Sequence, residues 1–292
     1  MYYKNPSYKT FYYINVSLLL LVSILCILPM LHILSVSLSG KSATEANLVT
    51  FLPIDFNLDN YAKTFENSNF INALQISVLR SAIGTVLAMA VTVLAAFPLS
   101  RSGAEFKART FYVWFFLIVL IFDAGLIPHY LLNQKLGLVG SFWVYILPHL
   151  LSIWNIILMM NFYRSLPKEL DEAAIMDGAT SFRILTSVYL PISMPAIATL
   201  SLFTLVGHWN NWFDGVLYMR SPDQWPMATL LQTIVVAKDL SKTGIDFEDL
   251  EMLSNRGVKA AQIFIAMLPI LAVYPLLQRF FVKGIVLGAV KE

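Results

Sequence analysis

Charged residues are scarce in this sequence. Asp, Glu, Lys and Arg together make up 13% of its 292 residues, whereas a soluble domain usually carries about 25%. Hydrophobic residues reach 58%, and the mean hydropathy is +0.68. This balance excludes a single water-soluble core. The net charge is only +2 and the basic residues form no patch, which argues against nucleic acid as a partner.

Cysteine is almost absent as well. The one cysteine, Cys26, excludes an intrachain disulfide and gives no indication of an oxidising compartment. Gly40-Lys41-Ser42 resembles the end of a phosphate-binding loop, but the first glycine of that motif would fall at Ser35 and no strand precedes it. We therefore expect no nucleotide site here.

Enzyme motifs are lacking too. The sequence has neither a His-Glu-x-x-His zinc pattern nor a Gly-x-Ser-x-Gly nucleophile elbow. Its histidines are scattered, and we interpret them as hydrogen-bonded packing residues rather than metal ligands: His32, His129, His149 and His208. An intramembrane enzyme is the least favoured alternative, and no metal or cofactor is expected on this chain.

The apolar residues fall in six runs, each close to the length of about 20 residues that crosses a bilayer as a helix. We predict an all-α integral membrane protein with six transmembrane helices, at residues 12–36, 71–98, 110–132, 141–163, 188–212 and 259–281. The first run, from Phe11 to Leu38, is much longer than the core of a signal peptide. It is therefore expected to be a retained helix. Residues 1–292 are expected to form a single domain.

Lysine and arginine counts predict the orientation. Eleven of these residues flank the helices on one side: Lys4, Lys9, Arg101, Lys107, Arg109, Arg164, Lys168, Arg183, Arg279, Lys283 and Lys291. The short turn 133–140 on the opposite side has only Lys135, and it also contains Gly137 and Gly140. Because short cytoplasmic segments carry the excess of positive charge, both termini should face the cytoplasm. The long connections 37–70 and 213–258 should then lie outside.

Prolines interrupt several of the apolar runs: Pro29, Pro98, Pro128, Pro148, Pro191, Pro195 and Pro269. Breaks in a membrane helix are tolerated where neighbouring helices or a cavity satisfy the freed backbone groups. The prolines are compatible with helices packed around a path through the membrane and, equally, with ordinary kinks in a bundle.

The polar connection 164–187 is the most informative segment. Pro167 suits the first turn of a helix, acidic residues follow at the positive end of the helix dipole, and Gly178 is a natural stop. We predict a helix of about three turns, followed by a second helix that starts at Thr180. The second helix should place these residues on one face: Phe182, Leu185, Val188 and Tyr189. The first helix could dock into a partner protein or lie along the membrane surface.

The spacing in this segment resembles the cytoplasmic signature of permease subunits of bacterial ABC importers. That signature is Glu-Ala-Ala, three residues, Gly, nine residues, an aliphatic residue, one residue and Leu-Pro. Here Glu172-Ala173-Ala174 leads to Gly178, and Val188 precedes Leu190-Pro191. Valine stands where isoleucine is the commoner residue, which is a trivial departure.

Further motifs resemble the carbohydrate-importing members of this family. They are Asn72, the Ala-Ala-Phe-Pro-Leu-Ser-Arg run ending at Arg101, Gly125-Leu-Ile-Pro128, Gly207-His-Trp-Asn-Asn-Trp212 and the C-terminal Phe281-Val-Lys-Gly284 and Gly288-Ala-Val-Lys291. One departure is Phe122-Asp123-Ala124-Gly125, where a pair of glycines is expected before Leu-Ile-Pro. Within this branch, the chain is most similar to permeases for complex, often uronic-acid-bearing oligosaccharides.

The resemblance implies a division of labour. This chain would pair with a second permease subunit in a bacterial cell membrane and receive a sugar from an extracellular solute-binding protein. Two ATPase subunits would use ATP and Mg and would bind the coupling loop 164–187. The residues implied in that coupling are Glu172, Ala173, Ala174, Asp177, Gly178, Leu190 and Pro191. A permease of the same type for an amino acid, a polyamine or phosphate is the main alternative.

Candidate pathway residues come from two places. Arg80 lies near the middle of the second run, where a charge is costly unless it faces water or a partner. Ser77, Arg80, Ser81 and Gly84 share one polar, small-residue face. Arg80 would attract an acidic sugar, or it would hold the two permeases together through a buried carboxylate or backbone carbonyls; the second role is favoured.

The other place is the sequence after His208, namely Trp209, Asn210, Asn211 and Trp212. Tryptophans near a membrane interface usually anchor the helix, which is the favoured interpretation. Stacking of sugars on aromatic rings, with amides bonding their hydroxyls, is the alternative.

Overall fold

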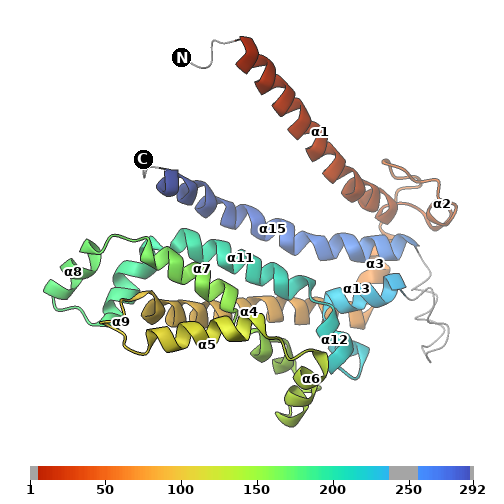
Figure 1. Ribbon diagram of the computed structural model, residues 1–292. Coiled ribbons are helices and arrows are strands. Elements are labelled where there is room, and N and C mark those ends of the chain that lie inside the picture. The colour runs from red at the N-terminus through yellow and green to blue at the C-terminus, as the bar shows by residue number, and fades with distance from the viewer. Residues whose placement is uncertain (1–5, 237–255, 290–292) are drawn as a thin grey trace. The chain divides into compact units, whose positions relative to one another are not determined.

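The computed structural model describes residues 6–236 and 256–289 (Figure 1). All regular elements in these ranges are helical, which confirms the predicted all-α class. The α-helices are α1 (Pro6–Ser37), α2 (Lys41–Glu45), α3 (Asp59–Glu66), α4 (Ser68–Ser100), α5 (Arg109–Ile121), α6 (Leu126–Lys135), α7 (Ile153–Arg164), α8 (Glu169–Met176), α9 (Ser181–Ile184), α10 (Leu190–Ile192), α11 (Met194–Asn210), α12 (Phe213–Tyr218), α13 (Met227–Val236) and α15 (Arg256–Ala289). Short 3-10 turns are η2 (Phe142–Tyr145), η3 (Leu147–His149) and η5 (Pro222–Gln224), and η4 (Leu185–Tyr189) is a π-helical turn.

The chain divides into two compact units. The first comprises Met1–Ile71 and Thr233–Pro269, and the second comprises Asn72–Gln232 and Ile270–Glu292. The coupling loop and all the candidate pathway residues fall in the second unit.

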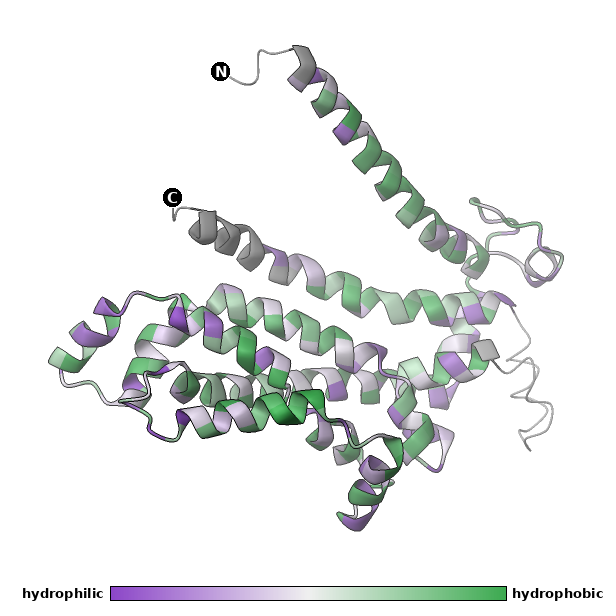
Figure 2. Cartoon of the chain, in the orientation of Figure 1, coloured by the Kyte–Doolittle hydropathy of each residue, from purple (hydrophilic) through white to green (hydrophobic). Residues whose placement is uncertain are grey.

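Three helices in the described residues are long and apolar enough to cross a membrane by themselves. They are Tyr8–Ser37, Ser68–Ser100 and Arg256–Pro275. Figure 2 shows hydrophobic colouring along most of α1. Three further candidates are pairs of helices with a sharp bend at a short break: Arg109–Ile121 with Leu126–Lys135, Phe142–His149 with Ile153–Arg164, and Ser181–Ile192 with Met194–Asn210. Six spans therefore require each bent pair to count as one.

The third predicted span, 110–132, is not one continuous helix. The chain bends by 115° between α5 and α6. Gly125 takes φ 81° at this break, a conformation open to glycine and costly for other residues. The Asp123 carboxylate accepts hydrogen bonds from the Gly125 N–H (3.0 Å) and from His129 Nε2 (3.0 Å). Asp123 thus holds the turn in the segment that departs from the family pattern.

The fourth and fifth predicted spans are also broken, at 46° and 80°. Pro148 lies in the turn η3 ahead of α7, and the second break falls at Ser193 between Pro191 and Pro195. By contrast, Pro29 and Pro98 lie inside continuous helices. Prolines therefore lie at these two bends, but a proline in this chain does not always break its helix.

The connection 37–70 is folded rather than irregular, a feature that sequence analysis missed. Within the first unit, Asn60 on α3 donates hydrogen bonds from Nδ2 to the carbonyls of Ser37 and Ser39, both at 3.0 Å. Ser35 Oγ donates to the Phe51 carbonyl at 2.7 Å. These bonds tie the segment after α1 back onto the end of that helix.

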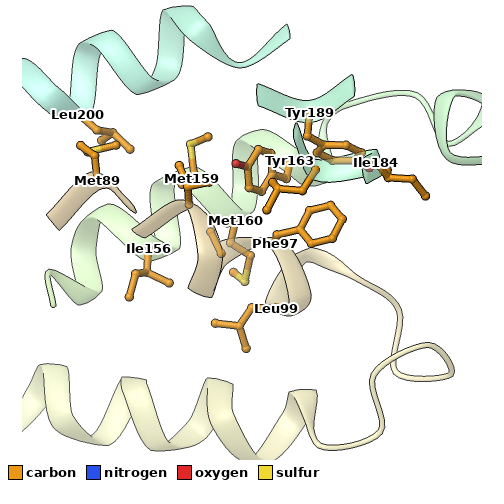
Figure 3. Close-up of a cluster of buried hydrophobic side chains, with 13 residues drawn as sticks. Met89, Phe97, Leu99, Ile156, Met159, Met160, Tyr163, Ile184, Tyr189 and Leu200 are labelled. Atoms are coloured by element: carbon orange, nitrogen blue, oxygen red, sulfur yellow. The ribbon is translucent and has the colours of Figure 1, made fainter. Parts of the chain in front are cut away.

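The core of the second unit gathers side chains from α4, α7, α11 and the segment 181–189. Met89, Phe97, Ile156, Met159, Tyr163, Tyr189 and Leu200 are all buried in it (Figure 3). The rings of Phe97, Tyr163 and Tyr189 meet edge to face at 5.2–6.2 Å. Of the face predicted for the second helix, Leu185 and Tyr189 are buried, but Phe182 is exposed. The π-helical turn at 185–189 changes the angular spacing, so Phe182 leaves the common face.

Candidate functional site

Arg80 on α4 is completely buried, at 0% exposure. Its Nη2 donates to Asp214 Oδ2 at 2.5 Å, and its Nη1 donates to the Asn211 carbonyl at 2.9 Å. The guanidinium also lies over the Tyr145 ring, 4.8 Å from the centroid. A buried arginine in an apolar setting needs such a set of partners, because an unpaired buried charge is strongly destabilising.

Asp214 is the centre of this network. Besides Arg80, its Oδ2 accepts hydrogen bonds from His149 Nε2 and Asn211 Nδ2, both at 2.9 Å. Asp214 belongs to α12, beyond the end of α11. Burial by itself raises the pKa of this carboxyl, but the bonded His149 and the charge of Arg80 outweigh burial and lower the pKa below its ordinary value. Asp214 is therefore ionised at neutral pH.

The local sequence explains how Asp214 is placed. α11 ends at Asn210, and Asn211 is extended at the C-cap. The Asn211 side-chain oxygen accepts a hydrogen bond from the Asp214 N–H at 3.3 Å, a local bond that favours turns over continued helix. The chain therefore leaves α11, turns, and presents Asp214 to Arg80.

Gly84 lets α4 approach His208 on α11. A Cβ at this position would lie 2.6 Å from His208 Nε2, closer than van der Waals contact allows. Small residues are common where membrane helices approach closely. Gly84 is thus required by packing, and it lies one turn beyond Arg80 on the same helix.

A cavity of about 320 Å³ opens beside this network. It is lined by His149, Ser152, Asn155, Phe203, Thr204, Gly207, His208 and Asn211. Asn155 Nδ2 donates to Thr204 Oγ1 at 3.0 Å, which joins α7 to α11. Hydroxyls, amides and imidazoles line the cavity together with one aromatic ring. This lining suits a ligand with many hydroxyl groups better than an apolar one.

The structure brings together only part of the predicted pathway set. Arg80 and Asn211 are in the network, and Asn211 also lines the cavity. Ser77 instead accepts a hydrogen bond from the Met227 N–H (2.7 Å) and is buried. Trp209 is buried, while Asn210 and Trp212 are exposed. None of these three lines the cavity.

One expectation for Arg80 needs correction. The favoured role was a contact with the second permease, but the carboxylate that neutralises Arg80 belongs to its own chain. The polar face of Ser77, Arg80, Ser81 and Gly84 is indeed shared, yet all four residues are buried within the chain. Sequence analysis missed Asp214 altogether. It interpreted His149 and His208 as hydrogen-bonded packing residues, and His149 does bond to Asp214. Asp214 lies 134 residues from Arg80, and no local pattern links them.

The predicted short helix of the coupling loop is present as α8, with eight residues rather than three turns, and none of them is buried. Pro167 lies ahead of the helix and not in its first turn, since Lys168 is the N-cap. Gly178 ends the segment with φ +71°, and its N–H bonds to the Ile175 carbonyl at 2.9 Å. Thr180 caps the next helix by accepting from the Arg183 N–H, as predicted.

The signature residues are mostly accessible. Glu172, Ala173, Asp177, Gly178 and Pro191 are exposed, and Ala174 and Leu190 are partly buried. Figure 1 shows α8 at the end of its unit, beyond the ends of α7 and α11. Its apolar residues Ile175 and Met176 are 61% and 87% exposed, an unusual arrangement for a free helix in water.

Residues 85–287 match the family of binding-protein-dependent transport system inner membrane components. The chain belongs to this family. It is a permease subunit of an ABC transporter and not an enzyme, as the resemblance implied.

Two proteins from Bacillus subtilis (strain 168) are similar to this chain over nearly the full length of both partners in each comparison. Protein LplC is 36% identical over 92% of this chain and 91% of its own. The polygalacturonan/rhamnogalacturonan transport system permease protein YtcP is 34% identical over 94% of this chain and 95% of its own. A solved bacterial ABC transporter involved in the import of the acidic polysaccharide alginate matches with a TM-score of 0.84 and 27% identity, over 95% of this chain and 98% of the other.

Proposed function

We propose that this permease forms one half of the path of an ATP-driven importer for oligosaccharides, and that the cavity between α7 and α11 receives a sugar unit in transit. The observation that carries the proposal is the lining of that cavity. It offers hydroxyl, amide and imidazole groups and the exposed ring of Phe203, and a sugar presents hydroxyls around an apolar ring face. Relatives of this permease are named for polysaccharide transport, which supports the same substrate class.

The electrostatics favour acidic or neutral sugars over cations. The ionised Asp214 is already neutralised by Arg80, so the network offers no free negative charge to a cation. The first turn of α7 also borders the cavity, with Ser152 as its N-cap, and the positive end of a helix dipole favours negative or hydrogen-bond-accepting groups. Polyamines are therefore disfavoured as cargo.

The coupling part of the proposal rests on α8. An exposed helix with two apolar side chains at its end suits a groove on a second protein. In this proposal α8 docks on one of two ATPase subunits that use ATP and Mg, a second permease completes the path, and an extracellular binding protein delivers the sugar. In the same proposal the chain has six spans with both termini in the cytoplasm, so α8 lies on the ATPase side; the lysine and arginine counts support this orientation.

Gly207 allows a direct test of the cavity. It lines the cavity, and a Cβ built on it meets nothing within 4 Å. Gly207→Leu should therefore fill the space without straining the chain. In proteoliposomes that contain the permease pair, the ATPases and the binding protein, we expect uptake of labelled oligogalacturonate to fall more than tenfold, while ATP hydrolysis and assembly persist.

Two control variants make the result specific. Gly207→Ala adds one methyl group and should keep most of the uptake. Val206→Leu adds volume on the neighbouring position of α11, which does not line the cavity, and should be neutral. Full uptake by Gly207→Leu would place the sugar path elsewhere. A wild-type complex that takes up an amino acid or phosphate, and no oligosaccharide, would overturn the substrate class.

A further inference from the structure

A partly buried carboxylate, that of Asp171, ties α8 to the rest of its unit. Asp171 Oδ2 accepts hydrogen bonds from Arg101 Nη1 at 2.5 Å and from Tyr189 Oη at 2.7 Å. The Arg101 and Asp171 side chains are only 16% and 15% exposed, whereas Glu169 and Glu172 on the same helix are exposed. Asp171 thus differs from the other acidic residues of α8, which are free to face a partner.

Arg101 joins this carboxylate to α4. Its guanidinium lies over the ring of Phe97, 4.3 Å from the centroid, and over the ring of Tyr189 at 5.0 Å. Phe97 is a residue of α4, and its ring packs edge to face on Tyr189 at 5.2 Å. Figure 3 shows Phe97 and Tyr189 within the buried cluster of the unit. A charged guanidinium held between two rings and a carboxylate makes several favourable contacts at once.

The same helix leads to the cavity network. α4 is continuous over 33 residues, from Ser68 to Ser100, and Arg80 precedes Arg101 by a helical distance of roughly 30 Å. Near Arg80, α4 makes two contacts with the site. Arg80 bonds to Asp214, and Gly84 packs against His208. A helix is stiff along its axis, so a displacement applied near Arg101 reaches the cavity wall.

We propose that the clamp of Arg101, Asp171 and Tyr189 transmits the movement of α8 to α4, and that Arg101 is the positioning residue of this step. This inference rests on the proposed docking of the ATPase on α8. With the clamp intact, α8 and α4 move as one body during the ATP cycle. With the clamp broken, the ATPase still binds α8 and hydrolyses ATP, but α4 no longer follows and transport is uncoupled.

The test uses the reconstituted complex and the variant Arg101→Gln. We expect the number of sugar molecules imported per ATP hydrolysed to fall at least tenfold, with the apparent KM for the loaded binding protein unchanged. Asp171→Asn should have the same effect, and the double variant should be no worse than either single variant. Arg101→Lys, which keeps the charge, should retain at least half of the coupling.

Arg109→Gln is the matched control. Arg109 lies on the same cytoplasmic loop and also touches the end of α4, but its Nε bonds to the Leu99 carbonyl at 2.9 Å rather than to α8. It should couple normally. Equal uncoupling by Arg109→Gln would show that loss of charge on this loop, and not the clamp, is responsible.

A second measurement does not depend on the sugar. Spin labels at Leu94, exposed on α4, and Lys168, the exposed N-cap of α8, report the distance between the two helices in a Cys26→Ser background. The wild type should keep one narrow distance with and without ATP, and Arg101→Gln should broaden it when ATP is added. A narrow distance in Arg101→Gln would refute the clamp. Failure of the wild type to import oligosaccharide would instead refute the proposed function, and the labels would still report on the clamp.

Discussion

Removing either partner of the buried ion pair between Arg80 and Asp214 should show how far the stability of the fold depends on this pair. Breaking a buried pair costs about 3–5 kcal/mol, because the remaining charge is left without compensation. In Arg80→Gln, Asp214 keeps its bonds from His149 and Asn211, so we expect the lower value, about 3 kcal/mol. In Asp214→Asn, the guanidinium keeps only the Asn211 carbonyl and the Tyr145 ring, so we expect the upper value, about 5 kcal/mol.

Thermal unfolding of the purified complex measures this difference. A destabilisation of 1 kcal/mol lowers Tm by about 2–4 °C in a domain of this size, so Arg80→Gln should lower Tm by about 6–12 °C and Asp214→Asn by more. The double variant should lose less than the sum of the two, since no charge is left unpaired. Lys41→Gln is the control: the pair of Lys41 with Glu45 is exposed and 3.9 Å long, and such pairs contribute about 0–0.5 kcal/mol.

The same variant decides between a structural role of Arg80 within its own chain and the attraction of an acidic sugar. Because Arg80 is fully buried against its own chain, uptake of acidic and neutral oligosaccharides should fall by the same factor when normalised to assembled complex. A Tm shift below 2 °C for Arg80→Gln would refute the structural role. A selective loss of acidic substrates in an intact complex would assign Arg80 to substrate binding.

Three further predictions concern packing, coupling and topology. Gly84→Ala should destabilise the complex by about 1–3 kcal/mol, the usual cost of overpacking, since its Cβ would meet His208, whereas Gly207→Ala should be neutral in the same unfolding assay. Glu172→Lys and Gly178→Val should each weaken co-purification of the ATPase and abolish uptake while membrane insertion persists. In Gly178→Val the cause is backbone strain, because valine at φ +71° costs about 1 kcal/mol or more. Normal uptake by both variants would mean that this loop is not the docking element. Single cysteines at Arg101, Arg183 and Asp246 in a Cys26→Ser background should react with an impermeant reagent in intact cells only at position 246, which lies outside the described residues, and strong labelling at 101 or 183 would refute the six-span topology.

The sequence by itself determined the class of this protein and the position of the short helix α8. Long apolar runs have few alternatives to membrane helices, and a short helix bounded by acidic residues and a glycine is a local feature that needs no tertiary contact. The spacing from Glu172 to Pro191 is likewise local, and the family match over residues 85–287 confirms what it indicated. The prediction of α8 erred only in its length and in the place of Pro167.

Only the tertiary structure decided what neutralises Arg80 and where the cavity lies. Asp214 and His149 are 65 residues apart in the chain and meet at one carboxylate oxygen, a result of helix packing that no periodicity encodes. The break at Gly125 is a similar case, because it depends on a positive φ and on the Asp123 side chain, while the hydropathy of residues 110–132 indicates an unbroken helix. Apolar character specifies that a segment enters the membrane, but the way in which its polar groups are satisfied is settled only when the helices pack together.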